Sequence, residues 1–131
     1  MASDLPEGFV PFAEVEGFIE RNGPYYVKDE ADGSPRYGFM TGPEHGNPNG
    51  IVHGGAVFSF VDTAFGHLVV KETGRFCATI SVNCEYMAAT PVGAFVEAKG
   101  RIKKVTGSMV FADMDVLHDD TLLMSATCVF K

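Results

Sequence analysis

Hydrophobic residues follow two different periods along the chain. Between about Gly54 and Glu72 they occur on nearly every side of a helical projection, and Gly74 then supplies a residue suited to ending a helix. A helix without a broad polar face must be enclosed by other elements. Beyond it the period changes to two, the period of half-buried strands. The pattern predicts strands over 76–87, 94–105, 109–117 and 122–130, which short turns would join into an antiparallel meander.

The N-terminal part of the chain carries shorter signals. A helix is predicted within residues 9–21, where four apolar residues have helical spacing: Phe12, Val15, Phe18 and Ile19. The sequence Asn22-Gly23-Pro24 ends it. The segments Tyr25–Lys28 and Tyr37–Met40 flank a turn cluster at 32–35, and this arrangement predicts a hairpin.

Together these elements predict a single α+β domain over residues 1–131, with residues 1–24 as an N-terminal segment that holds the short helix. Five or six antiparallel strands would wrap around the one long helix. Such a sheet leaves an open edge and leaves part of the helix uncovered, and pairing with a second copy would cover both. We therefore expect a homodimer or a dimer of dimers.

Composition and charge narrow the class of function. Hydrophobic residues make up 46% of the 131 residues and charged residues 21%, which is typical of a globular protein. Ten basic against 17 acidic residues give a net charge of −7, which argues against nucleic acids and anionic membranes as partners. The apolar stretch 51–70 is long enough to cross a bilayer, but it contains Asp62 and two histidines, so we interpret it as a buried helix of a soluble domain.

The cysteines indicate a cellular compartment. Cys77, Cys84 and Cys128 are odd in number and lack the spacing of metal ligands, so we interpret them as small core side chains in a reducing environment. The N-terminus has no signal-peptide pattern, and we expect a cytoplasmic location. No metal site is predicted, and the sequence has no phosphate-binding or dinucleotide-binding glycine motif, so no cofactor is predicted.

Asp62 is the first candidate for chemistry. It lies within the long helix among apolar neighbours, and a buried carboxylate must find donors, become neutral or face a cavity. One interpretation is a structural aspartate that bonds to neighbouring backbone or to a threonine hydroxyl. The other is a general base or nucleophile in a cleft.

A second candidate lies where the loop 41–50 meets the helix. The first N–H groups of a helix have no intrahelical partner, and the helix dipole is positive there. In His53-Gly54-Gly55 the two glycines let another group approach that backbone closely, which favours a site for a carbonyl oxygen or an oxyanion. The alternative is a flexible hinge before the helix. Asn47 can orient a carbonyl or a water through its amide, or it can be only a turn former.

Two further polar features have weaker signals. Thr79, on the polar face of the strand 76–87, could hold a water beside the carboxylate or be an ordinary sheet residue. Thr106-Gly107-Ser108 could approach a phosphate through its backbone, although a hairpin turn explains the same residues. Serine-hydrolase chemistry has no support, because Ser59 does not stand in a nucleophile-elbow motif.

The residues Asn47, His53-Gly54-Gly55 and Asp62, with the apolar helix and the strands that follow, resemble the PaaI-like acyl-CoA thioesterases of the hotdog fold. The resemblance covers roughly residues 37–131. The strand Ile80–Met87 followed by Thr90-Pro91 is similar to a strand-then-proline signature of that family. The resemblance implies hydrolysis of a small aromatic or a short-chain or medium-chain acyl-CoA, without metal or cofactor.

The resemblance also implies roles for individual residues. Asn47 and the backbone N–H of Gly54 would polarise the thioester carbonyl, and Asp62 of the other subunit would activate water or attack directly. Thr79 would help to hold that water. His53 would orient the start of the helix or lie near the thioester sulfur. Substrate contacts are assigned to three residues of the helix: Gly55, Phe58 and Phe65. Phe58 and Phe65 would line an acyl pocket, unless they are only core residues.

Two other functions remain open on this fold. A non-catalytic acyl-CoA binding or sensing module would not need Asp62 beside His53-Gly54-Gly55, and it would usually carry an output domain. A dehydratase acting on acyl thioesters needs a catalytic histidine paired with an acidic residue, and the order of His53 and Asp62 does not match the usual one. We therefore favour hydrolysis.

Overall fold

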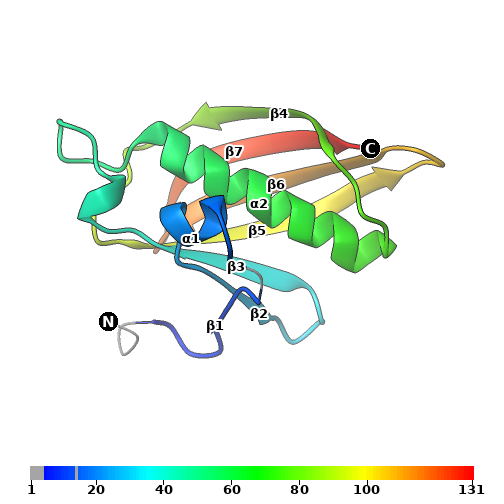
Figure 1. The fold of residues 1–131 in the computed structure, drawn as a ribbon, viewed down its shortest axis with the longest axis horizontal. Coiled ribbons are helices and arrows are strands. Elements are labelled where there is room, and N and C mark those ends of the chain that lie inside the picture. The colour runs from blue at the N-terminus through cyan, green and yellow to red at the C-terminus, as the bar shows by residue number, and fades with distance from the viewer. Residues whose placement is uncertain (1–4, 14) are drawn as a thin grey trace.

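The computed structural model describes residues 5–13 and 15–131, and it places the long helix against one face of a curved antiparallel sheet (Figure 1). In chain order the elements are β1 (Val10–Pro11), α1 (Phe18–Asn22), β2 (Tyr25–Asp29), β3 (Pro35–Met40), the 3-10 turn η2 (Pro43–His45), α2 (Gly54–Thr73), β4 (Thr79–Tyr86), β5 (Phe95–Val105), β6 (Val110–His118) and β7 (Thr121–Phe130). The sheet order is β1-β2-β3-β5-β6-β7-β4. The predicted α+β hotdog architecture is therefore confirmed, with seven strands, including the two-residue β1, where five or six were expected.

Helix α2 has the boundaries that the sequence predicts. It begins after the N-cap His53 and ends at Gly74, whose φ of 69° is the left-handed conformation that glycine adopts without strain. Its inner side is buried in the core: Val57, Phe60, Val61, Ala64, Phe65, Leu68 and Val69. Val70, on the outer side, keeps 44% of its surface exposed. Part of the helix is therefore uncovered in the single chain, as the pattern predicts.

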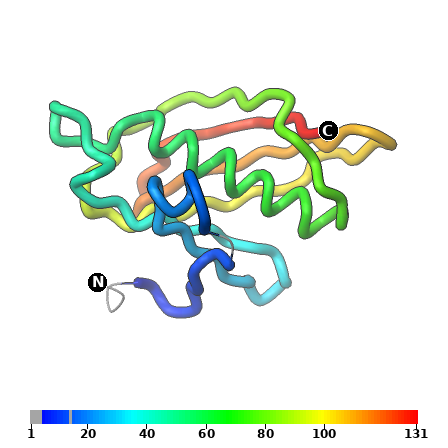
Figure 2. Tube along the Cα trace, in the orientation of Figure 1, coloured from blue at the N-terminus to red at the C-terminus, as the bar shows by residue number. Residues whose placement is uncertain are grey.

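The expected four-strand meander is wrong for its first strand. Strand β4 lies at an edge of the sheet and pairs with β7, so β6 and β7 separate it from β5. Of the four strands after α2, only β5, β6 and β7 form the expected meander. The segment 87–94 does not make a tight turn, because it packs against the loop before α2, where the N–H of Val52 donates to the oxygen of Thr90 at 2.9 Å. Figure 2 shows this segment running beside that loop on its way to β5. Periodicity within β4 contains no information about this long-range contact.

The predicted N-terminal helix is also wrong over most of its length. Only Phe18–Asn22 are helical, whereas Val10 and Pro11 pair with β2 as the short strand β1. The apolar spacing does not reflect one helix face. Phe12 packs on the rings of Tyr25 and Tyr37, but Phe18 is 61% exposed. The predicted hairpin of β2 and β3 is confirmed.

None of the helices in the described residues is long and apolar enough to span a membrane. Most of the apolar stretch 51–70 forms α2, whose inner side is buried against the sheet. Strand β4, by contrast, is an edge strand without a single fully buried residue. Its Ile80 and Tyr86 are 56% and 53% exposed.

The surroundings of His67 predict that the stability of the fold depends on pH. The hydroxyl of Tyr37 and Nδ1 of His67 lie 2.9 Å apart, and Phe12 packs on the imidazole. Burial lowers the pKa of His67 below its ordinary value, and the nearby Lys71 lowers it further, while Asp29 partly opposes both. Folding therefore favours the neutral imidazole.

We expect acid to destabilise the protein in part through this group. The unfolded chain binds the proton of His67 at a higher pH than the folded chain, so its contribution to stability is lost as the pH falls below the ordinary histidine pKa of about 6.5. In His67→Gln the urea midpoint should fall less between pH 7.5 and pH 5.5 than in the wild type. An equal fall in the two proteins would contradict this assignment.

Candidate active site

The start of α2 is held in place by two histidines. Nδ1 of His53 accepts the N–H of Gly55 at 2.9 Å, which makes His53 the N-cap, and the backbone N–H of His53 donates to the oxygen of His45 at 2.7 Å. His45 is itself buried, and its Nδ1 accepts the N–H of Gly42 at 2.9 Å. The junction between this loop and the first turn of α2, which contains Gly54 and Gly55, is therefore fixed. The alternative of a flexible hinge has no support from this arrangement.

Gly54 keeps an unused donor in this first turn. The N–H of Gly55 is taken by His53, and the N–H of Ala56 donates to the oxygen of His53 at 2.9 Å. The N–H of Gly54 has no acceptor in residues 5–13 and 15–131. A free N–H at the positive end of a helix is suited to a carbonyl oxygen that gains negative charge.

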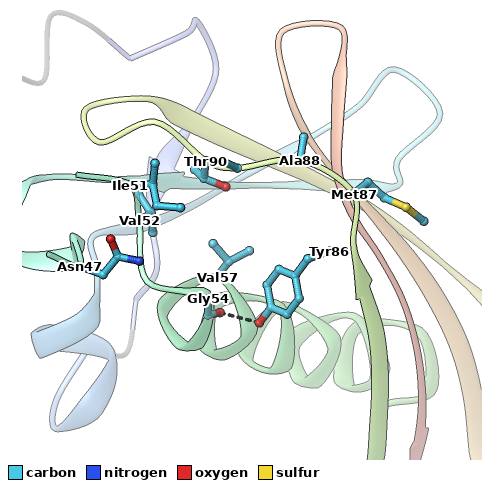
Figure 3. A pocket seen from close by; sticks show the side chains of 10 residues that line it. Asn47, Ile51, Val52, Gly54, Val57, Tyr86, Met87, Ala88 and Thr90 are labelled. Atoms are coloured by element: carbon cyan, nitrogen blue, oxygen red, sulfur yellow. Dashed lines mark hydrogen bonds between the residues drawn. The ribbon is translucent and has the colours of Figure 1, made fainter. Parts of the chain in front are cut away.

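Asn47 provides a second donor next to Gly54. Its Oδ1 accepts the N–H of Asn49 at 2.9 Å, and its backbone N–H donates to the oxygen of Ile51 at 2.8 Å. This turn leaves the amide nitrogen of Asn47 unpartnered within the described residues, and Figure 3 shows it directed toward the space above Gly54. The glycine at position 50, with φ 81°, makes the tight turn possible.

Asn47 and Gly54 share a cavity of about 370 Å³. Its wall combines the loop before α2, the first turn of α2 and the segment after β4 (Figure 3). The lining residues are Asn47, Ile51, Val52, Gly54, Val57, Tyr86, Met87, Ala88, Ala89 and Thr90. None of them carries a charge, so the cavity is suited to a neutral, largely apolar group.

The other residues predicted at the helix start lie elsewhere. His53 and Gly55 line a separate, more open hollow of about 310 Å³ on the other side of the start of α2, together with Glu44 and Ser59. Phe58 is half-buried, whereas Phe65 has no accessible surface and packs against Phe130. Within one chain, neither phenylalanine lines the cavity of Asn47 and Gly54.

Asp62 is joined to β4 by one hydrogen bond. The hydroxyl of Thr79 donates to its Oδ1 at 2.8 Å, so the two residues predicted to act together do meet. Asp62 is half-buried, and its Oδ2 has no hydrogen-bond partner in the part of the chain that the structure describes. The Thr79 bond fits both interpretations of Asp62, and the unused oxygen leaves it able to act on another molecule.

The single chain does not bring Asp62 to the cavity. Asp62 follows Gly54 by eight helical residues, which places it about 12 Å further along the axis of α2. One thioester carbonyl and its attacking water span only about 3 Å. The donors and the carboxylate of one chain therefore cannot serve the same reacting carbonyl.

Tyr86 is a residue of the site that the sequence pattern does not single out. Its hydroxyl donates to the oxygen of Gly54 at 2.7 Å, and its ring forms part of the cavity wall (Figure 3). The alternation in 76–87 does place it on the apolar side of the strand. Nothing in that pattern, however, indicates that the end of β4 passes over the start of α2.

No group of three or more His, Cys, Asp or Glu side chains that could hold a metal ion occurs in residues 5–13 and 15–131. The donors in the cavity are an amide and a backbone N–H, which suit an acyl carbonyl.

Comparison with known proteins places the chain in a family. Residues 49–125, more than half of the chain, match the thioesterase superfamily. The segment matched includes most of the cavity wall, Asp62 and most of the sheet. An acyl-coenzyme A thioesterase of Xenopus laevis is 30% identical over 94 residues, which cover 70% of this chain and 42% of that protein.

Solved structures share the same fold. Zebrafish thioesterase superfamily member 2 superposes with a TM-score of 0.79 at 22% identity, covering 89% of this chain and 87% of that one. A mutant form of the phenylacetic acid degradation protein PaaI from Thermus thermophilus superposes with a TM-score of 0.75 at 23% identity, covering 86% and 96%. The chain is thus a hotdog-fold protein that belongs to the thioesterase superfamily.

Proposed function

We propose that the protein is an acyl-CoA thioesterase whose active site is shared between two copies of the chain. The observation that carries the proposal is the pair of unused donors on one uncharged cavity, the N–H of Gly54 and the amide of Asn47. Support for acyl-CoA as the substrate comes from the family and from the Xenopus relative named as an acyl-coenzyme A thioesterase.

In the proposed reaction the thioester carbonyl accepts hydrogen bonds from Gly54 and Asn47. Asp62 of the partner subunit takes a proton from water as the water oxygen attacks the carbonyl carbon. The tetrahedral oxyanion is stabilised by the two donors and the positive end of α2. Its collapse breaks the carbon–sulfur bond, and the proton held by Asp62 passes to the leaving thiolate. CoA leaves as the thiol together with a carboxylic acid, which then loses its remaining proton to water and becomes a carboxylate. An alternative first step is direct attack by Asp62 on the carbonyl.

The remaining predicted residues take supporting roles in this proposal. Thr79 holds Asp62 through its Oδ1 and leaves Oδ2 to face the water. His53 fixes the first turn of α2. Phe58 and Gly55 lie on the accessible side of the helix, where a second chain could enclose them with the substrate. Phe65 supports that wall from the core.

A dimer built on β4 accounts for the separation of the two half-sites. The outer edge of β4 has no partner strand in the described chain, and its apolar side chains Ile80 and Tyr86 are exposed. An unpaired eight-residue edge favours pairing with another chain. A two-fold axis at this edge sets two α2 helices side by side, and it can bring the partner's Asp62 to the cavity of Asn47 and Gly54.

The uncharged wall favours a neutral acyl group, either a small aromatic group or a short or medium chain. The three cysteines are all unpaired thiols, which fits the reducing cytoplasm that we propose as the location.

Replacing Asp62 tests the chemistry. In a free-thiol assay over a panel of aromatic, short-chain and medium-chain acyl-CoAs, we expect Asp62→Asn to lower kcat about 10²–10⁴-fold, as is usual when a general base is lost. Asp120→Asn, which changes an exposed turn carboxylate, is the matched control and should keep full activity. Equal rates for Asp62→Asn and the wild type would refute the assignment. Binding of acyl-CoA without thiol release by the wild type would establish a binding module instead.

Mixed dimers test whether the site is shared. Asn47→Ala and Asp62→Asn should each be inactive alone, but a dimer of the two variants has one site with both wild-type residues. Equal mixing by co-refolding should therefore restore about a quarter of the wild-type activity if the two residues come from different chains of a two-fold dimer. If Asn47 and Asp62 of the same chain act together, mixing restores nothing.

The uncharged lining of the cavity predicts that the protein discriminates against acyl groups that carry a charge. A terminal carboxylate on the acyl chain would have to lose water without gaining a cationic partner, which is costly. We expect kcat/KM for a glutaryl-type CoA thioester to be at least about tenfold lower than for a neutral acyl group with the same number of carbons, a difference of about 1.4 kcal/mol. Equal values would show that the acyl chain does not occupy this cavity.

A further inference from the structure

Tyr86 joins the end of β4 to the first residue of α2. Its hydroxyl donates to the oxygen of Gly54 at 2.7 Å, and Figure 3 shows the ring standing above the helix start at the edge of the cavity. A side chain on Gly54 would place its Cβ 3.2 Å from the phenol carbon and oxygen of Tyr86. Such a contact is tighter than most Cβ contacts, so a side chain at position 54 would displace the ring by a few tenths of an ångström.

The peptide group between Gly54 and Gly55 is held at both ends. Its carbonyl oxygen, on Gly54, accepts from Tyr86, and its N–H, on Gly55, donates at 2.9 Å to Nδ1 of His53. The two bonds come from different elements, because Tyr86 belongs to β4 and His53 to the loop before α2. Together they fix the orientation of this peptide plane.

The preceding peptide group, between His53 and Gly54, carries the unused N–H. Its own carbonyl, on His53, accepts the N–H of Ala56 at 2.9 Å. Gly54 lies between these two peptide groups, and a glycine has no side chain to restrict its φ and ψ. The direction of the unused N–H is therefore set by the bonds on either side of Gly54, and the bond from Tyr86 is the one that comes from outside the helix and its loop.

We propose that Tyr86 is a positioning residue that aligns the N–H of Gly54 with the thioester carbonyl, an inference that rests on the proposed thioesterase function. Tyr86 acts through the backbone of Gly54, and its role does not involve the partner's Asp62. Removal of its hydroxyl therefore weakens the oxyanion contact without removing any group that binds the substrate in its ground state.

The hydroxyl stays a donor over the range of an assay. Partial burial raises the pKa of Tyr86 above its ordinary value, and Cys84 raises it further. The phenol therefore remains protonated at neutral and moderately alkaline pH.

The test is Tyr86→Phe, which keeps the ring and removes only the hydroxyl. We expect kcat to fall about tenfold with KM unchanged, less than the 10²–10³-fold loss that follows complete removal of an oxyanion donor. Tyr26→Phe is the matched control, because the Tyr26 hydroxyl makes no hydrogen bond within the described residues and its ring packs on Phe95, away from the cavity. This control should keep the wild-type kcat.

A second measurement, hydrogen exchange of the backbone amide, reports on the orientation of this peptide group and does not depend on catalysis. In Tyr86→Phe the amide of Gly55 should exchange its hydrogen faster than in the wild type, because one of the two bonds that orient its peptide group is gone. His53→Ala releases the other end of the same peptide, so Tyr86→Phe should lower kcat less in a His53→Ala background than in the wild type. His53→Asn, which keeps an acceptor at the N-cap, should preserve the full effect of Tyr86→Phe.

The outcomes separate this inference from the function on which it rests. A wild type that releases no thiol from any acyl-CoA overturns both. An active wild type with an unchanged kcat in Tyr86→Phe overturns the positioning role alone. A raised KM with an unchanged kcat also overturns it, because that result would make Tyr86 a residue that binds the substrate before reaction.

Discussion

The attachment of β4 to α2 is the constraint on which the rest of the site depends. Two hydrogen bonds make it, Tyr86 to the oxygen of Gly54 and Thr79 to Asp62, and they lie at the two ends of the strand. The first holds the end of the helix that offers donors, and the second orients the acid. Because β4 is also the edge of the sheet, the strand that organises both half-sites is the strand that is open to a second chain.

Helix α2 has a structural role on its inner side and a chemical role in its first turn. Its inner residues, such as Phe60 and Phe65, are fully buried and fix the helix against the sheet. Its first turn cannot satisfy all of its own N–H groups, as in any α-helix. Here His53 takes the N–H of Gly55, and the N–H of Gly54 is left unused within the described residues. The rigid core thus holds a backbone donor in place without burying a charged side chain.

Local sequence patterns predicted those parts of the structure that depend on local forces. The ends of α2 follow from the N-cap at His53 and the glycine at position 74, and the hairpin of β2 and β3 follows from its turn residues. The residues alone offer a threonine as one partner of Asp62 and place Thr79 on the polar face of its strand, and the resemblance to a family joins the two. The position of β4 beside β7 and the contact of Tyr86 with Gly54 could not be predicted, because both depend on where a strand lies relative to distant elements.

The prediction of an N-terminal helix failed for a related reason. Phe12 serves the aromatic cluster around Tyr37 and His67, and that tertiary contact overrides its helical spacing.

The position of the site residues along one helix is the reason why the proposed active site uses two chains. The backbone donor of Gly54 requires the N-terminal turn of a helix, where N–H groups are free, whereas Asp62 lies in the interior of the same helix, about 12 Å away. No rearrangement of side chains closes such a gap, since an aspartate side chain reaches only a fraction of it. Two helices side by side in opposite directions remove the difficulty, because the interior of each then lies beside the start of the other. The same separation that keeps Asp62 from the donors of its own chain would therefore give two equivalent sites in the two-fold dimer that we propose.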